Sequence, residues 1–184
     1  MVAPRNAHQT RHAMASLYTH LCRCGASLSE TERWRIAAAI HEESQRHGYN
    51  PFFVLAMVQV ESACSPRAIG PRGSVGLIQL QPRVARELAR DADIPWNGTR
   101  TLTLPRINVR LGVQYLAELE KRFRDPWVAV AAYNLGPGRV ARMSRQRAQK
   151  AHYVRKVLDR YEQLLAENAR ESPVGKLRRR VDRL

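Results

Sequence analysis

The chain has 184 residues, of which 44% are hydrophobic and 26% charged, which is typical of one soluble globular domain and leaves little room for two. Its formal net charge is +15 and its sequence pI about 10.9, so an anionic partner is expected. The arginines are scattered along the chain without a nucleic-acid-binding motif, which argues against specific nucleic-acid recognition.

The first part of the chain, residues 1–28, is predicted to be a flexible N-terminal segment. Met1 to Ser29 interleaves histidines and arginines with short apolar stretches, so no signal-peptide core is visible. No stretch of the sequence approaches the roughly 20 apolar residues that a transmembrane helix needs. The prediction is therefore a soluble protein without a transmembrane segment, with a monomer as the default oligomeric state.

Three cysteines, Cys22, Cys24 and Cys64, give an odd number. Only one residue separates Cys22 from Cys24, whereas zinc sites usually have two to four between paired ligands, so no metal site is predicted. Cys64 is interpreted as a small buried apolar residue rather than as a catalytic thiol.

Capping signals predict that residues 29–168 form a stack of helices. Ser29 and Glu32 fit a capping box, in which each side chain accepts a hydrogen bond from the other's backbone N–H, and Gly48 ends this helix. Asn50 and Pro51 suit the start of the next helix, because proline lacks the N–H that has no partner there. Further helices are predicted over Arg83 to Arg90, over Ile107 to Phe123, from Asp125-Pro126 and over Ala151 to Glu167. The fold class is all-α, a single globular helical domain with at most a small hairpin.

Two segments break the helical pattern. Prolines and glycines between Ser65 and Leu80 exclude a long helix and predict a loop with a turn or small hairpin, where binding groups are commonly held. Residues 169–184 are predicted to be a basic C-terminal tail, which contains the cluster Lys176 to Arg180.

Glu61 is the candidate catalytic residue. It follows the apolar run Pro51 to Val60, so its carboxyl group is expected to lie where water is scarce. Burial disfavours the charged form of a carboxyl group and raises its pKa, which keeps the group available as a proton donor near neutral pH. The alternative is a structural ion pair between Glu61 and an arginine such as Arg67.

Four pieces of sequence occur in a characteristic order: Glu61-Ser62, Ser65 to Ala68, Gly73 to Pro82 (GSVGLIQLQP) and Ala131 to Val140 (AAYNLGPGRV). Together they resemble the soluble lytic transglycosylase (SLT) domain family over roughly Trp34 to Met143. The resemblance implies a lysozyme-like α fold. It also implies a peptidoglycan lytic transglycosylase, an enzyme that cleaves the β-1,4 bond between N-acetylmuramic acid and N-acetylglucosamine.

The same resemblance implies the chemistry of the reaction. Glu61 would be the single general acid/base, and the 6-hydroxyl of the muramic acid would attack its own anomeric carbon to close a 1,6-anhydro ring. Glycosidases with two carboxylates need the second one within about 5 to 10 Å of the acid. Residues Ser62 to Val84 contain no Asp or Glu, which agrees with one-acid chemistry. Neither a metal nor an organic cofactor is predicted.

Six further residues are predicted to bind substrate on the basis of the resemblance: Ser62, Gly76, Ile78, Gln79, Tyr133 and Asn134. Ile78 stands where the family commonly has methionine, and Leu135 where it commonly has alanine. Structural alternatives stay open, with Gln79 satisfying loop backbone groups, Tyr133 packing as a core aromatic and Ser62 ending a helix. The three tryptophans are expected to pack in the core.

The expected partners are peptidoglycan glycan strands and envelope or secretion machinery, and the expected location is a bacterial periplasm or cell envelope. The positive charge would favour binding to the carboxylates of peptidoglycan, and added salt would weaken that binding. Two alternative functions remain. One is a hydrolase of goose-lysozyme type, whose products end in reducing muramic acid, and the other is a wall-binding module that releases no fragments.

Overall fold

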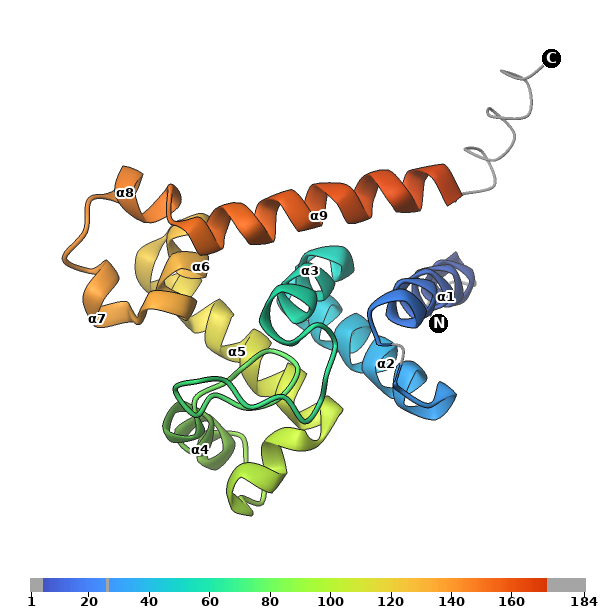
Figure 1. Ribbon diagram of the computed structural model, residues 1–184, viewed down its shortest axis with the longest axis horizontal. Helices are drawn as coiled ribbons and strands as arrows, with labels where there is room; N and C mark the ends of the chain where they lie inside the picture. Colours follow the sequence, from blue (N-terminus) through green and yellow to red (C-terminus); the bar gives the residue numbers. More distant parts are fainter. Residues whose placement is uncertain (1–4, 26, 172–184) are drawn as a thin grey trace.

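The computed structural model describes residues 5–25 and 27–171, whose regular structure is helical (Figure 1). In chain order the elements are α1 (Arg5–Cys24), α2 (Glu30–His47), α3 (Pro51–Ser62), α4 (Pro82–Asp91), the 3-10 helix η1 (Gly98–Thr103), α5 (Pro105–Phe123), α6 (Pro126–Leu135), α7 (Pro137–Val140), α8 (Arg145–Gln149) and α9 (His152–Glu171). These residues contain no β-strand, only two isolated bridges, so the predicted all-α fold is confirmed. None of the described helices is long and apolar enough to cross a membrane.

Helix α2 begins and ends as predicted. The Ser29 N–H donates to Glu32 Oε2 over 2.9 Å, and the Glu32 N–H donates to Ser29 Oγ over 3.2 Å, which completes the capping box. Gly48 follows the helix with a φ of 73°, a left-handed conformation that glycine adopts without a Cβ clash. Helix α3 begins at Asn50, whose side chain accepts a hydrogen bond from the Phe52 N–H over 2.9 Å, with a proline as its first residue.

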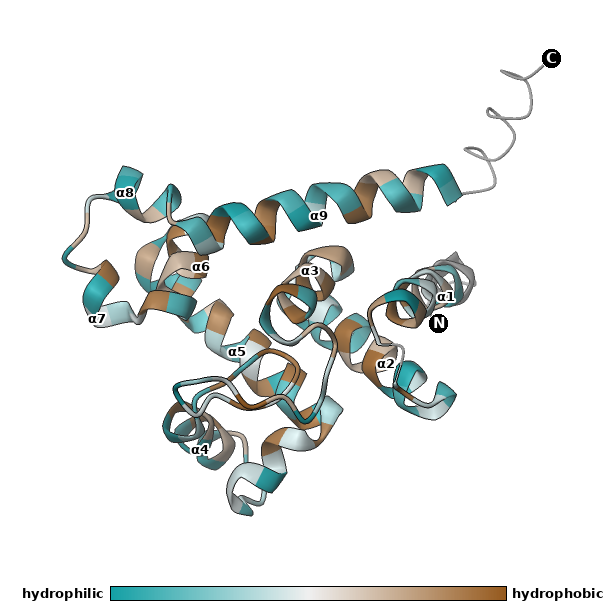
Figure 2. Ribbon diagram, in the orientation of Figure 1, coloured by the Kyte–Doolittle hydropathy of each residue, from teal (hydrophilic) through white to brown (hydrophobic). Residues whose placement is uncertain are grey.

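Helix α3 is the central element of the fold. It packs against α1, α2 and α9, and Figure 2 shows that it is hydrophobic along much of its length. The main core cluster includes most of α3, and a second cluster lies around α4, η1 and α5. Tyr115 of α5 and Tyr133 of α6 contact both clusters. The carboxylate near the end of α3 is therefore carried by a helix that is packed on several sides.

The described part of the N-terminal segment differs from the prediction, whereas residues 1–4 and 26 lie outside the described residues. Residues expected to be flexible form helix α1, whose Leu17 and Leu21 are fully buried in the main core. A disulfide joins Cys24, at the end of α1, to Cys64, just after α3. Cys64 is buried, as predicted, but it is one half of a disulfide rather than an isolated apolar residue. The sequence pattern does not reveal the pairing, because the two cysteines are 40 residues apart and form no recognised spacing motif.

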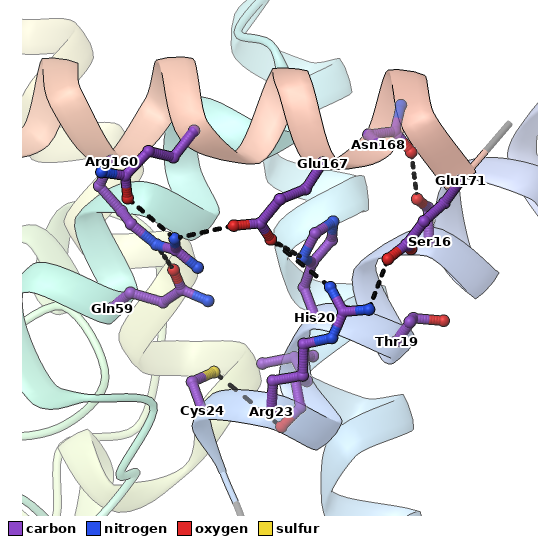
Figure 3. A network of polar contacts seen from close by, with 12 residues as sticks. Ser16, Thr19, His20, Arg23, Cys24, Gln59, Arg160, Glu167, Asn168 and Glu171 are labelled. Carbon is purple, nitrogen blue, oxygen red and sulfur yellow. Dashed lines mark hydrogen bonds and ion pairs between the residues drawn. The ribbon is translucent and has the colours of Figure 1, made fainter. Parts of the chain in front are cut away.

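Polar side chains connect α1 to α9 (Figure 3). Glu167 of α9 lies 3.3 Å from His20 Nδ1 and 3.5 Å from a guanidinium nitrogen of Arg23. Arg23 also donates a hydrogen bond to Glu171. Burial lowers the pKa of His20, which favours the neutral imidazole. Together with the disulfide, these contacts hold α1 against the rest of the domain.

The segment between α3 and α4 is the predicted loop. Val75 forms isolated antiparallel bridges with Ile69 and with Leu80, so the chain folds back on itself as expected of a small hairpin. The two backbone hydrogen bonds between Val75 and Leu80 measure 3.0 and 3.1 Å. At the other end of the chain, α9 continues to Glu171, and residues 172–184 of the predicted basic tail lie outside the described residues.

Candidate active site

A cleft of about 430 Å³ opens beside the C-terminal end of α3. Its walls also come from the loop before α4 and from α4, α5 and α6. The lining residues are Glu61, Arg72, Ser74, Gln79, Leu80, Gln81, Val84, Tyr115, Tyr133, Asn134, Leu135, Gly136 and Pro137. Among the described residues that line the cleft, Glu61 is the only carboxylate. It is thus the one group there whose ordinary chemistry suits proton donation and acceptance.

The Glu61 carboxyl group is tuned by its surroundings. Burial raises its pKa from 4.5 to about 7, and this effect outweighs the Tyr153 hydroxyl and the Arg72 guanidinium, both of which favour the carboxylate. The Tyr153 hydroxyl lies near Glu61 but completes no hydrogen bond of ordinary geometry with any described residue. A carboxyl group with a pKa near neutrality can release and recover a proton within one reaction cycle.

Two tyrosines interact with Glu61. Burial, together with the nearby Glu61 carboxylate, raises the pKa of Tyr133 and of Tyr153 well above the ordinary value. Both phenols therefore stay protonated near neutral pH and take part through hydrogen bonds rather than as charges. The Tyr133 hydroxyl donates to the Ile78 carbonyl over 2.9 Å, which ties α6 to the loop before α4.

The loop from Gly76 to Gln79 is supported by a buried amide. Asn108 of α5 is fully buried. Its Oδ1 accepts a hydrogen bond from the Ile78 N–H over 2.9 Å, and its Nδ2 donates to the Val75 carbonyl over 3.0 Å. Gly76 has a φ of 87°, and a Cβ there would lie 2.3 Å from Asn108 Nδ2. The loop therefore requires glycine at this position, both for its conformation and for the close approach of Asn108.

Three of the predicted substrate-binding residues line the cleft together with Glu61: Gln79, Tyr133 and Asn134. Gln79 also satisfies the loop backbone, as the structural alternative expected. Its Nε2 donates to the carbonyls of Ala68 and Gly76 over 3.1 and 3.0 Å, and its Oε1 accepts from Ser74 Oγ over 2.7 Å. These three hydrogen bonds hold the Gln79 amide in one orientation at the wall of the cleft.

The other three predicted substrate-binding residues, Ser62, Gly76 and Ile78, are not among the residues that line the cleft. Ser62 Oγ donates to the Leu77 carbonyl over 2.7 Å, so it joins the end of α3 to the loop. The Ile78 side chain is fully buried and packs against the backbone of Gly112 in α5. Ile78, at the position where methionine was expected from the resemblance, therefore packs in the core.

Arg72 and Tyr153 were not predicted from the sequence. Arg72 lies in a tight turn closed by a 2.9 Å hydrogen bond from the Gly73 N–H to the Gly70 carbonyl, and the proline and glycine beside it are a signal for that turn. Tyr153 has no comparable local signal, because only the packing of α9 against α3 brings it near Glu61. Arg67, the expected alternative partner of Glu61, instead lies 3.5 Å from Glu32.

Replacing Arg72 with alanine is expected to raise the pKa of Glu61 further, because the guanidinium favours the charged carboxylate. Arg72 is exposed, so solvent screens its charge and the change should be smaller than about one pH unit. Carbon-13 NMR titration of the Glu61 carboxyl group measures it directly. The matched control is Arg67→Ala, which removes an exposed arginine from the same loop and should leave this titration unchanged. A Glu61 pKa that falls in Arg72→Ala would contradict the assignment.

Known proteins resemble this chain in sequence. The family model described as the Transglycosylase SLT domain matches residues 38–156, more than half of the chain. A soluble lytic murein transglycosylase of Salmonella typhimurium is 36% identical over 90 residues, which make up 48% of this chain and 14% of that protein. A membrane-bound lytic murein transglycosylase C of Haemophilus influenzae is 31% identical over 114 residues, which make up 56% of this chain and 32% of that protein. The chain thus matches less than half the length of these relatives.

Solved structures share the fold. The lytic transglycosylase Slt of Pseudomonas aeruginosa, solved as an inactive mutant, has a TM-score of 0.61 at 22% identity, over 95% of this chain and 39% of its own. The 70 kDa soluble lytic transglycosylase in complex with bulgecin A has a TM-score of 0.62 at 21% identity, over 85% of this chain and 30% of its own. Since the family model covers most of the helical body and the neighbours share its fold, this chain belongs to the Transglycosylase SLT domain family.

Proposed function

We propose that this chain is a peptidoglycan lytic transglycosylase. It would cleave the β-1,4 bond between N-acetylmuramic acid and N-acetylglucosamine and leave a 1,6-anhydro end on the muramic acid. The observation that carries the proposal is the position of Glu61, which lies within the segment matched by the family model and is the only carboxylate in the described lining of the cleft. The relatives' names, lytic murein transglycosylases, support the same substrate class.

In the proposed cycle, protonated Glu61 donates its proton to the glycosidic oxygen as the bond to the anomeric carbon breaks. The resulting carboxylate then accepts the proton of the muramic acid 6-hydroxyl as that oxygen attacks the anomeric carbon. At the anomeric carbon, the bond to the glycosidic oxygen is broken and a bond to the 6-oxygen is formed. The proton of the 6-hydroxyl replaces the one that Glu61 donated, so Glu61 ends the cycle protonated. A carboxyl pKa of about 7 supports both roles near neutral pH.

The composition of the cleft favours this internal transfer over hydrolysis. Inverting and retaining hydrolases use a second carboxylate, placed about 5 to 10 Å from the acid, either to activate water or to attack the sugar. Within the described lining, no second carboxylate accompanies Glu61. The 6-hydroxyl of the substrate needs no activating group other than the carboxylate that the first step leaves behind.

Asn134 is assigned to orient the sugar. It lies in the last turn of α6 and lines the cleft with Glu61. The neighbouring Tyr133 hydroxyl already donates to the Ile78 carbonyl, so it holds the wall of the cleft. The Asn134 amide offers both a donor and an acceptor, which suit the acetamido group at position 2 of the sugar.

The proposed location is a bacterial cell envelope, where the substrate is found. The disulfide between Cys24 and Cys64 supports it, because disulfides persist in oxidising compartments such as the periplasm and are rare in the reducing cytosol. The high net positive charge would concentrate the protein on the carboxylates of its substrate.

Mass spectrometry of the products tests the proposed reaction. Digestion of purified peptidoglycan should release muropeptides that have lost one water relative to those made by a lysozyme. Sodium borohydride provides the internal control, because it reduces free muramic acid ends but leaves anhydro ends unchanged. Reducing ends in place of anhydro ends would identify a hydrolase of goose-lysozyme type. Binding to peptidoglycan without release of fragments would identify a wall-binding module.

A further inference from the structure

A second hollow lies beside α4. This groove has a volume of about 880 Å³, and its walls are α4 and the segment that continues into η1. Arg83, Arg86 and Arg90 line it from α4 together with one acidic residue, Glu87, and Ile94 and Trp96 line it from the segment that follows. We refer to these six residues as the α4 groove.

The three arginines form a row because their spacing places them on one side of the helix. Arg83 and Arg90 keep 93% and 77% of their side-chain surface exposed. Their acidic contacts are weak ones at the surface, a 3.9 Å approach of Arg83 to Glu87 and a 3.1 Å pair between Arg90 and its neighbour Asp91. The row can therefore exchange these contacts for an anionic ligand at small cost.

The floor of the groove is apolar. Ile94 and Trp96 are half-buried and pack against the second core cluster, which fixes them in place. Trp96 thus has a packed side and a side that lines the groove. A row of guanidinium groups beside a rigid indole suits a ligand that carries carboxylates on a partly apolar backbone, such as an acidic peptide.

The α4 groove adjoins the cleft of Glu61. Gln81 and Val84 line the cleft, whereas Pro82 and Arg83, which lie between them in the sequence, line the groove. Helix α4 therefore contributes residues to the walls of both hollows. A polymer held in the cleft can place a side branch over α4 and into the groove.

We propose that the α4 groove is a second binding site, which takes the carboxylate-bearing peptides attached to the glycan strands. This inference rests on the proposed function, because it assigns a site to a part of the same substrate. The site contributes affinity and selects peptide-bearing strands, whereas bond cleavage stays with Glu61.

Binding to two forms of the glycan tests the site. The ligands are soluble, uncrosslinked glycan strands with their peptides, and the same strands after an amidase has removed the peptides. The protein carries Glu61→Gln so that it leaves the ligands intact. The groove variant has Arg83→Gln, Arg86→Gln and Arg90→Gln. The matched control variant has Arg35→Gln, Lys121→Gln and Arg155→Gln, three exposed cations on α2, α5 and α9. Both variants lose the same positive charge.

The groove variant is expected to bind peptide-bearing strands about fivefold or more weakly, and to bind stripped strands within about twofold of the parent protein. The control variant should stay within about twofold on both ligands. Equal weakening by the two variants, equal weakening on the two ligands, or no weakening would overturn the proposal. A larger loss of affinity for a single-stranded oligonucleotide than for the glycan would assign the groove to phosphate polymers instead.

The proposed function is tested separately in this design. Release of anhydro-ended fragments by the wild-type protein depends on Glu61 and the cleft. Should the wild type release such fragments while the groove variant binds both ligands like its parent, only the second site fails. Should the wild type release none, the proposed function fails, whatever the groove binds.

Discussion

Replacing Glu61 with glutamine is expected to reduce the release of fragments from peptidoglycan by a factor of about a thousand or more. The amide keeps the size of the side chain but cannot supply the proton that the leaving oxygen needs. It also cannot accept the proton of the attacking hydroxyl, so both steps of the cycle are affected. The initial rate of release of soluble muropeptides from purified sacculi measures the effect.

Glu118→Gln is the matched control for this experiment. Glu118 is an exposed residue of α5, and the control makes the same chemical change away from the described cleft lining. Its activity should equal that of the wild type. If Glu61→Gln retained more than about a tenth of the wild-type rate, Glu61 would not be the general acid.

The raised pKa of Glu61 also predicts that the difference in stability between the wild type and Glu61→Gln depends on pH. Because the folded state holds the Glu61 proton more tightly than the unfolded state, its contribution to stability is fully present below pH 4.5 and is lost as the pH rises through about 7. Above that range the wild type buries a charged carboxylate, whereas Glu61→Gln does not. Urea unfolding should therefore show the variant to be more stable by roughly 1 to 3 kcal/mol near pH 8. A constant difference from acid to alkaline pH would show that Glu61 does not titrate as described.

Removing the disulfide between Cys24 and Cys64 is expected to lower the free energy of unfolding by about 4 kcal/mol, because a bond between residues 40 apart restricts the unfolded chain strongly. The bond also joins α1 to the chain immediately after Glu61. Without it, the two segments depend on core packing and on the polar contacts between α1 and α9. Urea unfolding of the double variant Cys24→Ala and Cys64→Ala, in oxidising buffer, measures the loss.

Cys22→Ala is the control for the disulfide. Cys22 is exposed and free, so its replacement should change the free energy of unfolding by less than about 0.5 kcal/mol. Addition of dithiothreitol should destabilise the wild type and Cys22→Ala alike and leave the double variant unchanged. A wild type that is indifferent to dithiothreitol would contradict the bond or its contribution.

The helix boundaries were predictable because capping is a local interaction. Ser29 and Glu32 bond to each other across a single turn, and Asn50 bonds two residues ahead. The same holds for the turn-rich loop before α4, whose glycines and prolines act through their own backbone angles. Helix α1 lacks such signals, and its stability comes from Leu17 and Leu21 in the core and from the disulfide.

The candidate site was predictable in part. Glu61 was identified from the apolar run before it and from the order of the motifs, and Gln79, Tyr133 and Asn134 line the same cleft. The motif does not distinguish a residue that lines the cleft from one that supports it. Ile78 illustrates this, because its place in the motif says nothing of its burial against α5.

The sequence by itself determined the helical class, the ends of several helices and the catalytic candidate, since these depend on residues within a few positions of one another. Only the tertiary structure decided which cysteines pair, that Tyr153 and Arg72 act on Glu61, and that α4 separates the cleft from a basic groove. The pKa of Glu61 belongs to this second group. Desolvation and long-range pairing depend on side chains far apart in the chain, which meet only after the helices have packed.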